Sequence, residues 1–78
     1  MAVATELFLA GNVYIDFPYE EVFFRFEKLT GKVFRRFYGD AFETQVAHDS
    51  KLYAEACCAG NAVSEQDYWQ GRGSGAAP

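Results

Sequence analysis

The chain has 78 residues and a formal net charge of −4, with 50% apolar and 18% aromatic residues. A chain of this length forms at most one domain and buries only about 60–65% of the surface that its unfolded form exposes, so a deep catalytic cleft beside a separate core is not expected. The aromatic content excludes disorder for most of the chain, and no apolar run approaches the roughly 20 residues that a membrane span needs.

The first predicted element is a β-hairpin near the N-terminus. Residues 7–10 and 13–15 are two β-prone runs, and Gly11 and Asn12 lie between them. A two-residue loop of this type, between runs of apolar residues, is typical of a hairpin turn. The sequence therefore predicts a first pair of antiparallel strands.

A helix is predicted over residues 18–29. Pro18 suits the first turn of a helix, where its missing N–H is not needed, and Gly31 is a suitable left-handed residue at the end. Phe24 does not fit the apolar face of this helix and is expected on its charged side, exposed to solvent. The apolar face itself has spacings of three and four and comprises Tyr19, Val22, Phe23, Phe26 and Leu29.

A second hairpin is predicted around Gly39 and Asp40. Each hairpin turn has a glycine followed by a residue that tolerates positive φ. A two-residue loop here places an aromatic pair and an opposite-charge pair in register. The predicted cross-strand pairs are Tyr38 with Ala41, Phe37 with Phe42, and Arg36 with Glu43.

Two further helical segments follow the second hairpin. Asp49 or Ser50 is expected to cap a helix that runs through Ala59 and ends at Gly60. Ser64 is expected to cap a short helical turn that places Tyr68 and Trp69 on the core. Residues 71–78 have the composition of a flexible tail.

Together these elements predict an α+β fold with an antiparallel sheet, built from two β-hairpin–helix units in the order β-β-α-β-β-α. Residues 1–70 form the single domain and residues 71–78 the tail. A competing interpretation starts from Asp40 and Glu43, whose spacing matches the aspartate form of a capping box. Residues 41–59 are then one long helix, and the fold is an N-terminal hairpin followed mostly by helices.

The cysteines and the single histidine do not indicate catalysis. Cys57 and Cys58 are adjacent, and a disulfide between neighbours is strained, so the class of disulfide scaffolds is excluded and a reduced, cytoplasmic setting is expected. If residues 41–59 are helical, His48 lies more than two turns from either thiol, too far for side-chain contact. One histidine and two adjacent cysteines also do not match the paired spacing of a zinc site.

Paired carboxylates are the remaining candidates for chemistry. Each acidic pair already has a structural role in the prediction, as a helix-dipole complement, a turn residue or a cap. Nothing in the sequence indicates the buried setting that shifts a catalytic pKa. The sequence therefore predicts a protein that is not an enzyme and needs no cofactor and no metal.

Charge is distributed in three blocks along the chain. Residues 1–24 carry −4, residues 25–36 carry +4 and residues 37–78 carry −4. In the middle block, Arg and Lys alternate with aromatic residues, a composition found both in protein interfaces and in platforms that bind single-stranded RNA. An acidic chain is repelled by phosphate backbones and attracted to basic protein surfaces, although a charge of this size also serves solubility alone.

We therefore predict a non-enzymatic module that binds, and inhibits or adapts, a larger protein with a basic surface, for example a nucleic-acid-handling protein. By analogy of composition, inhibitors, immunity proteins, antitoxin-like proteins and phage-encoded decoys are modules of this kind. The alternatives are a nucleic-acid-associated domain that uses residues 25–38, and a homodimer formed by edge strands; a membrane partner is not expected. The predicted contact residues are Glu20, Glu21, Phe24, Arg25, Arg35, Arg36, Tyr38 and Asp40.

Overall fold

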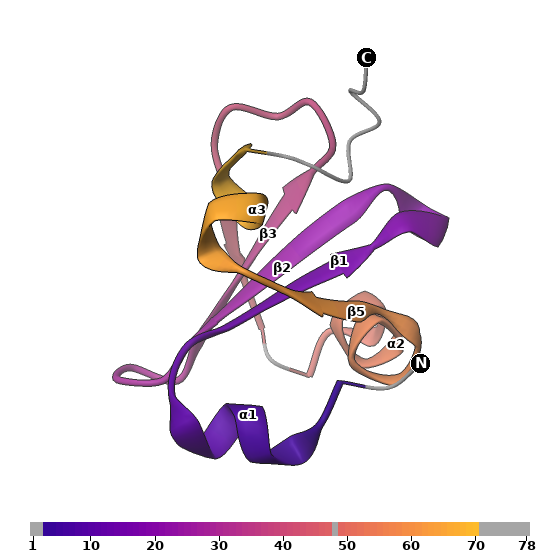
Figure 1. Ribbon diagram of the computed structural model, residues 1–78. Helices are drawn as coiled ribbons and strands as arrows, with labels where there is room; N and C mark the ends of the chain where they lie inside the picture. Colours follow the sequence, from indigo (N-terminus) through magenta and orange to yellow (C-terminus); the bar gives the residue numbers. More distant parts are fainter. Residues whose placement is uncertain (1–2, 48, 71–78) are drawn as a thin grey trace.

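The structure is a computed structural model that describes residues 3–47 and 49–70, and Figure 1 shows how their elements are arranged. Within these residues, five antiparallel strands form one sheet in the order β4-β3-β2-β1-β5. None of the described helices is long and apolar enough to span a membrane. In chain order the elements are α1 (Thr5–Ala10), β1 (Val13–Phe17), the 3₁₀ turn η1 (Pro18–Glu20), β2 (Val22–Glu27), β3 (Lys32–Phe37), β4 (Thr44–Val46), α2 (Lys51–Ala59), β5 (Asn61–Val63) and α3 (Glu65–Gln70).

The predicted α+β class and the antiparallel sheet are confirmed, but the predicted order of elements is wrong in the first half of the chain. The alternative with an N-terminal hairpin followed mostly by helices is also wrong, because residues 41–59 contain both β4 and α2. The predicted tail at residues 71–78 lies outside the described residues.

Residues 5–10 form helix α1 and not a strand. Both neighbours of β1 in the sheet are other segments, β2 on one side and β5 on the other. A strand at residues 7–10 would therefore have no place beside β1. The helix instead packs Phe8 edge-on against Phe26 of β2, with ring centroids 5.4 Å apart.

Residues 18–29 form a short turn and a strand where a helix was predicted. Pro18 does begin a helical turn, but this turn is η1, which ends after three residues. Val22, Phe23 and Phe24 follow one another and are all 0% exposed. Three consecutive buried side chains suit a central strand covered on both faces. The expectation that Phe24 is exposed is therefore wrong: its ring lies in the core, 5.4 Å from that of Tyr53.

The second half of the chain follows its prediction more closely. The observed pairs of β3 with β4, such as Val33 with Val46 and Arg35 with Thr44, have the predicted register. Gly39 has the positive φ expected of its turn, +86°. The pairing stops at Thr44, so residues 38–43 form a wider loop than the predicted two-residue turn. Gly31 also has positive φ, +74°, but in the turn between β2 and β3 and not at a helix end.

Two serines cap the helices as predicted. The Ser50 hydroxyl accepts a hydrogen bond from the Tyr53 N–H at the start of α2, and the Ser64 hydroxyl accepts one from the Asp67 N–H at the start of α3. Tyr68 is buried as expected, whereas Trp69 stays about half exposed. Strand β5, between these helices, was not predicted.

The two faces of the sheet have different character, and α2 and α3 cover opposite faces (Figure 1). The apolar face lies under α1 and α2. We call the face under α3 the polar–aromatic face. The apolar face presents Val13, Ile15, Phe17, Val22, Phe24 and Val33 to Tyr53 and Ala56 of α2, and the polar–aromatic face carries Tyr14, Asp16, Phe23, Arg25, Phe34 and Arg36.

Candidate interaction surface

Glu43 is the centre of a hydrogen-bonded network on the polar–aromatic face. Arg25 donates to both oxygens of its carboxylate, with Nε at 3.0 and 3.1 Å and Nη2 at 2.5 Å. The Tyr68 hydroxyl donates to the same carboxylate at 2.5 Å. Burial by itself raises the pKa of Glu43, but the hydrogen bonds from Arg25 and Tyr68 hold this pKa below its usual value. The carboxylate therefore stays ionised at neutral pH and ties the loop at 38–43 to β2 and α3.

Two arginines of this face are packed against aromatic rings. The Arg25 guanidinium lies 4.2 Å from the centre of the Phe34 ring. Arg36 is only 6% exposed and lies about 5 Å from the rings of Phe23 and Tyr68. Arg36 also donates to the backbone carbonyls of Tyr68 and Asp40. Arg36 thus holds α3 and the loop at 38–43 on the sheet, a structural role that leaves little of its charge at the surface.

Glu43 was predicted to pair with Arg36 across the second hairpin, and this prediction is wrong. The ion pair of Glu43 is with Arg25 of β2, two strands away from β4. The reason is that β4 begins only at Thr44, so Glu43 lies in the preceding loop and its side chain reaches over the polar–aromatic face. Arg36 contributes to the low pKa of Glu43 only through its charge.

Tyr38 connects the loop at 38–43 to the turn after β1. Its N–H donates to the carbonyl of Glu21 at 2.8 Å, and its hydroxyl donates to the carboxylate of Asp16. Burial and the neighbouring carboxylate raise the pKa of this hydroxyl, which stays protonated. Glu21 itself has a left-handed backbone, with φ of +55°, and its N–H donates to the carbonyl of Pro18.

We call the end of the sheet formed by residues 18–21 and 38–42 the acidic end. Glu20, Glu21 and Asp40, three of the predicted contact residues, are exposed there, and Tyr38 lies half-buried among them. Two large rings that the sequence analysis had assigned to packing, Tyr19 and Phe42, are also exposed at this end. The sequence signal that could have identified these two rings as exposed is their position next to acidic residues in turn-rich segments.

The other four predicted contact residues lie elsewhere. Arg25 and Arg36 belong to the buried network, and Phe24 belongs to the core. Arg35 is half-buried on the apolar side of β3, where its guanidinium lies 5.0 Å from the ring centre of Phe37. The structure therefore exposes Glu20, Glu21 and Asp40 at one end of the sheet, whereas Arg25 and Arg36 are engaged inside the protein, Arg36 in part with the carbonyl of Asp40.

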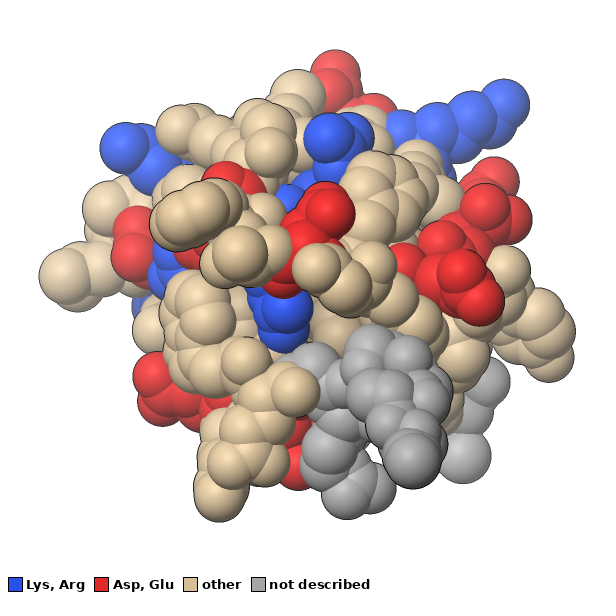
Figure 2. All heavy atoms as spheres, turned by 90° about the horizontal axis from the view of Figure 1, so that it is seen from above, with Lys and Arg blue, Asp and Glu red and all other residues tan. Residues whose placement is uncertain are grey.

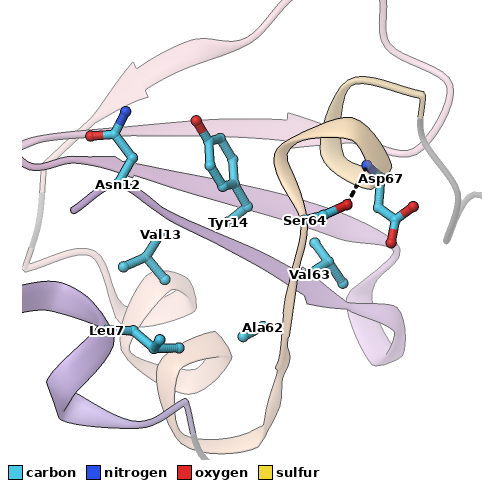
Figure 3. A pocket seen from close by; sticks show the side chains of 8 residues that line it. All are labelled: Leu7, Asn12, Val13, Tyr14, Ala62, Val63, Ser64 and Asp67. Carbon is cyan, nitrogen blue, oxygen red and sulfur yellow. Dashed lines mark hydrogen bonds between the residues drawn. The ribbon is translucent and has the colours of Figure 1, made fainter. Parts of the chain in front are cut away.

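One hollow, of about 350 Å³, lies between α1, β1, β5 and α3 (Figure 3). Two of its polar groups are used by the fold: the Ser64 hydroxyl caps α3, and the Asn12 amide oxygen accepts from the N–H of Lys28. The rest of the wall combines the apolar side chains of Leu7, Val13, Ala62 and Val63 with Tyr14 and Asp67 (Figure 3). The arrangement offers no nucleophile held by a general base.

The thiols and the acidic groups give no chemical site either. In the described part of the chain, no group of three or more His, Cys, Asp or Glu side chains is placed to hold a metal ion. Cys57 is half-buried and burial raises the pKa of its thiol, which opposes thiolate formation. His48 lies outside the described residues, so the predicted separation of His48 from the cysteines stays a prediction.

Comparisons with known proteins agree on one family. Residues 1–72 match the family model described as Tis1 immunity protein. The chain is 33% identical over 67 residues to "Immune protein Tis1" of Pseudomonas aeruginosa (strain UCBPP-PA14), which covers 85% of this chain and 87% of that protein. It is also similar to a chain in the crystal structure of the complex between the type VI effector Tas1 and its immunity protein, with a TM-score of 0.82, 30% identity, and 91% of this chain and 95% of that chain covered.

Proposed function

The chain belongs to the Tis1 immunity protein family, and we propose that it binds and neutralises a type VI effector related to Tas1. The observation that carries this proposal is the similarity, over nearly the whole of both chains, to a protein whose structure was solved in complex with an effector. Immunity proteins of this type are non-enzymatic binders, which agrees with the predicted small module that binds and inhibits a larger protein.

The structure supports neutralisation by stoichiometric binding. The polar network around Glu43 and the contacts of Tyr38 fix the loops of the acidic end before any partner arrives. Surfaces that are ordered in advance lose little conformational entropy on association, so more of the contact energy appears as affinity. We propose that the chain acts in the cytoplasm, where its free cysteines stay reduced.

We further propose that the effector presents a basic surface to this chain. The net charge of −4 and the exposed Glu20, Glu21 and Asp40 support this, because opposite charges accelerate association and fix orientation. The competing proposal, a nucleic-acid-binding role for residues 25–38, loses support because Arg25 and Arg36 are engaged in ion pairs, hydrogen bonds and ring contacts inside the protein.

Co-expression tests the proposal directly. The Tas1-related effector of the same bacterium is expressed in a heterologous host, with and without this chain. We expect growth to stop with the effector alone and to be restored by the chain, and the two proteins to co-elute on size exclusion. Growth arrest in the presence of soluble chain, together with separate elution of the two proteins, overturns the proposal.

A further inference from the structure

We propose that the acidic end is the surface through which this chain contacts the effector, with Tyr19 and Phe42 as anchoring side chains and a basic, partly apolar patch on the effector as the occupant. This inference rests on the proposed function and adds to it the side chains that make the contact.

Tyr19 and Phe42 are 84% and 85% exposed, although most of the other aromatic rings in the described residues are buried or half-buried. Leaving a large ring in water forgoes the free energy that its burial provides. Tyrosine is enriched among the few residues that dominate binding energy, and aromatic residues are enriched in interfaces. Exposed rings in a protein that otherwise buries its rings are therefore candidates for burial by a partner.

The two rings lie at the same end of the sheet. The pairs Phe17 with Val22 and Val22 with Phe37 align the end of β1, the start of β2 and the end of β3. Tyr19 follows β1 and Phe42 follows β3, so both residues lie in connections beyond this aligned edge. A partner surface placed against this end of the sheet would meet the two connections that carry the exposed rings.

A hollow beside Tyr19 gives the partner a place to insert a side chain. It has a volume of about 380 Å³ and is lined by Pro18, Tyr19, Ala59 and Asn61. The Tyr19 ring is also in edge contact with the Phe17 ring, whose centre is 6.0 Å away. A supported ring next to a hollow is the arrangement in which hot-spot residues of two partners interlock.

The charged side chains that the chain segments at this end contribute all have one sign, and Arg36, which donates to the carbonyl of Asp40, is only 6% exposed. Residues 13–21 and 37–43 contain five acidic residues and neither lysine nor arginine. Asp16 and Glu43 are hydrogen-bonded inside the protein, and Glu20, Glu21 and Asp40 form no ion pair among the residues that the structure describes. Figure 2, which views the molecule from above, shows one group of Asp and Glu side chains at the right, on the side where Figure 1 places the connection between β1 and β2; a Lys or Arg side chain lies above this group, and other acidic groups lie elsewhere on the face. A basic partner surface is the complement of such an end.

The opposite end of the sheet provides a matched control. Leu29, in the turn between β2 and β3, is 93% exposed, and Lys28 and Lys32 lie beside it. This end therefore offers exposed apolar surface with the opposite charge. If apolar exposure alone determined where the effector binds, both ends would serve equally well.

The test measures the affinity of purified chain for the purified Tas1-related effector by calorimetry. Because a tenfold loss of affinity corresponds to about 1.4 kcal/mol and hot-spot truncations typically cost more than this, we expect Tyr19→Ala and Phe42→Ala each to weaken binding by about tenfold or more. Leu29→Ala, the control, should leave the affinity within about twofold. Circular dichroism checks that each variant is folded, since all three side chains are exposed.

The acidic residues are tested through rates. The triple variant Glu20→Gln, Glu21→Gln, Asp40→Asn should slow association about threefold to tenfold at low salt and lose most of this effect at high salt. Its dissociation rate should change less than its association rate. An association rate equal to that of the wild type at low salt contradicts the assigned role of these charges.

Hydrogen exchange on the wild-type complex maps the surface without any variant. Protection on binding is expected in peptides that cover residues 17–21 and 37–43. If the wild type binds but protection falls on α1 and residues 28–31, or if only Leu29→Ala weakens binding, the assigned surface is wrong while the proposed function stands. If the wild type does not bind at all, the proposed function fails first.

Discussion

The two faces of the sheet use the same strands in opposite ways. On β2, Val22 and Phe24 point into the apolar core, while Phe23 and Arg25 point into the polar–aromatic network. Burial of apolar side-chain surface stabilises the apolar face, and this hydrophobic stabilisation does not depend on the direction of individual contacts. The polar–aromatic face depends on partners in particular places, because each buried charge or hydroxyl is costly without them. The first face thus stabilises the fold through burial alone, and the second also orders the loops of the acidic end through its hydrogen bonds.

Removing a ring from the apolar face should have the largest effect. Phe24→Ala leaves a cavity beside Tyr53 in a fully buried position and should lower the free energy of unfolding by about 3–5 kcal/mol. Urea denaturation measures this loss. Phe34→Ala, which removes a half-buried ring from the other face, serves as the control and should lower the free energy of unfolding clearly less. Equal losses would show that the two faces do not differ in the way described.

Removing the central charge of the polar–aromatic face should have a smaller but substantial effect. Glu43→Gln leaves the guanidinium of Arg25 without its bidentate partner at a site where both side chains are largely buried. A loss of about 2 kcal/mol is expected, between the values for buried and for exposed ion pairs.

The pairing of Glu43 with Arg25 is tested by a double-mutant cycle. Because Arg25→Met removes the unpaired charge, the double variant should lose less stability than the sum of the two single variants. Strict additivity of the two losses would mean that the ion pair contributes nothing specific.

A close approach on the apolar side should make Gly60 sensitive to a single methyl group. A Cβ at this position would lie 2.6 Å from the Ala56 carbonyl oxygen and 2.8 Å from Ile15 Cγ2. Gly60→Ala should therefore lower the free energy of unfolding by about 1–3 kcal/mol, because the added methyl group pushes α2 away from β1. Gly11→Ala is the matched control, because nothing lies within 4 Å of its added Cβ. A Gly60→Ala variant as stable as the wild type would contradict the contact between α2 and β1.

Acid should lower the free energy of unfolding by weakening the hydrogen bonds and ion pairs of the polar–aromatic face. This effect should be smallest near neutral pH. The folded state lowers the pKa of Glu43 and of Glu27 below the ordinary value of 4.5. A group whose pKa is lower in the folded state contributes stability above its unfolded pKa, and this contribution is lost as pH falls through the folded pKa. The free energy of unfolding should therefore change little from pH 7 to pH 5 and decline below about pH 4.5.

Denaturation over a pH series checks this dependence and assigns it. Glu43→Gln removes one of the two titrating carboxylates, so its stability should fall less steeply in acid than that of the wild type. A wild-type protein that becomes more stable on acidification would contradict the assigned pKa directions.

Segments with strong local signals were predictable from the sequence. Ser50 and Ser64 each provide a hydroxyl that caps the following helix, and this interaction involves residues only three positions apart. The register of β3 with β4 was also predictable, because a hairpin pairs neighbouring segments and side-chain complementarity selects their alignment. The acidic members of the candidate surface were predictable for a related reason, since charged residues near turns are exposed.

Strand β2 shows why the first half of the chain was misassigned. Its apolar residues occur at spacings of three and four, which fit one face of a helix, but Phe24 breaks that pattern. A strand covered on both faces has no alternation, so its periodicity resembles that of a buried helix. The run of β-branched and aromatic residues over 22–26 was the signal in favour of a strand. The misplacement of Phe24 on a solvent-exposed surface followed from this assignment.

The amino-acid sequence alone specified a small acidic α+β domain and led to the prediction of a protein-binding module, because composition, charge and capping depend on residues taken singly or close together. Assembly of the fold specified the rest: which strands are central, that Arg25 pairs with Glu43, and that Tyr19 and Phe42 extend from one end of the sheet. These features depend on contacts between residues far apart in the chain, and a local pattern cannot distinguish a ring that finds such a contact from one that does not.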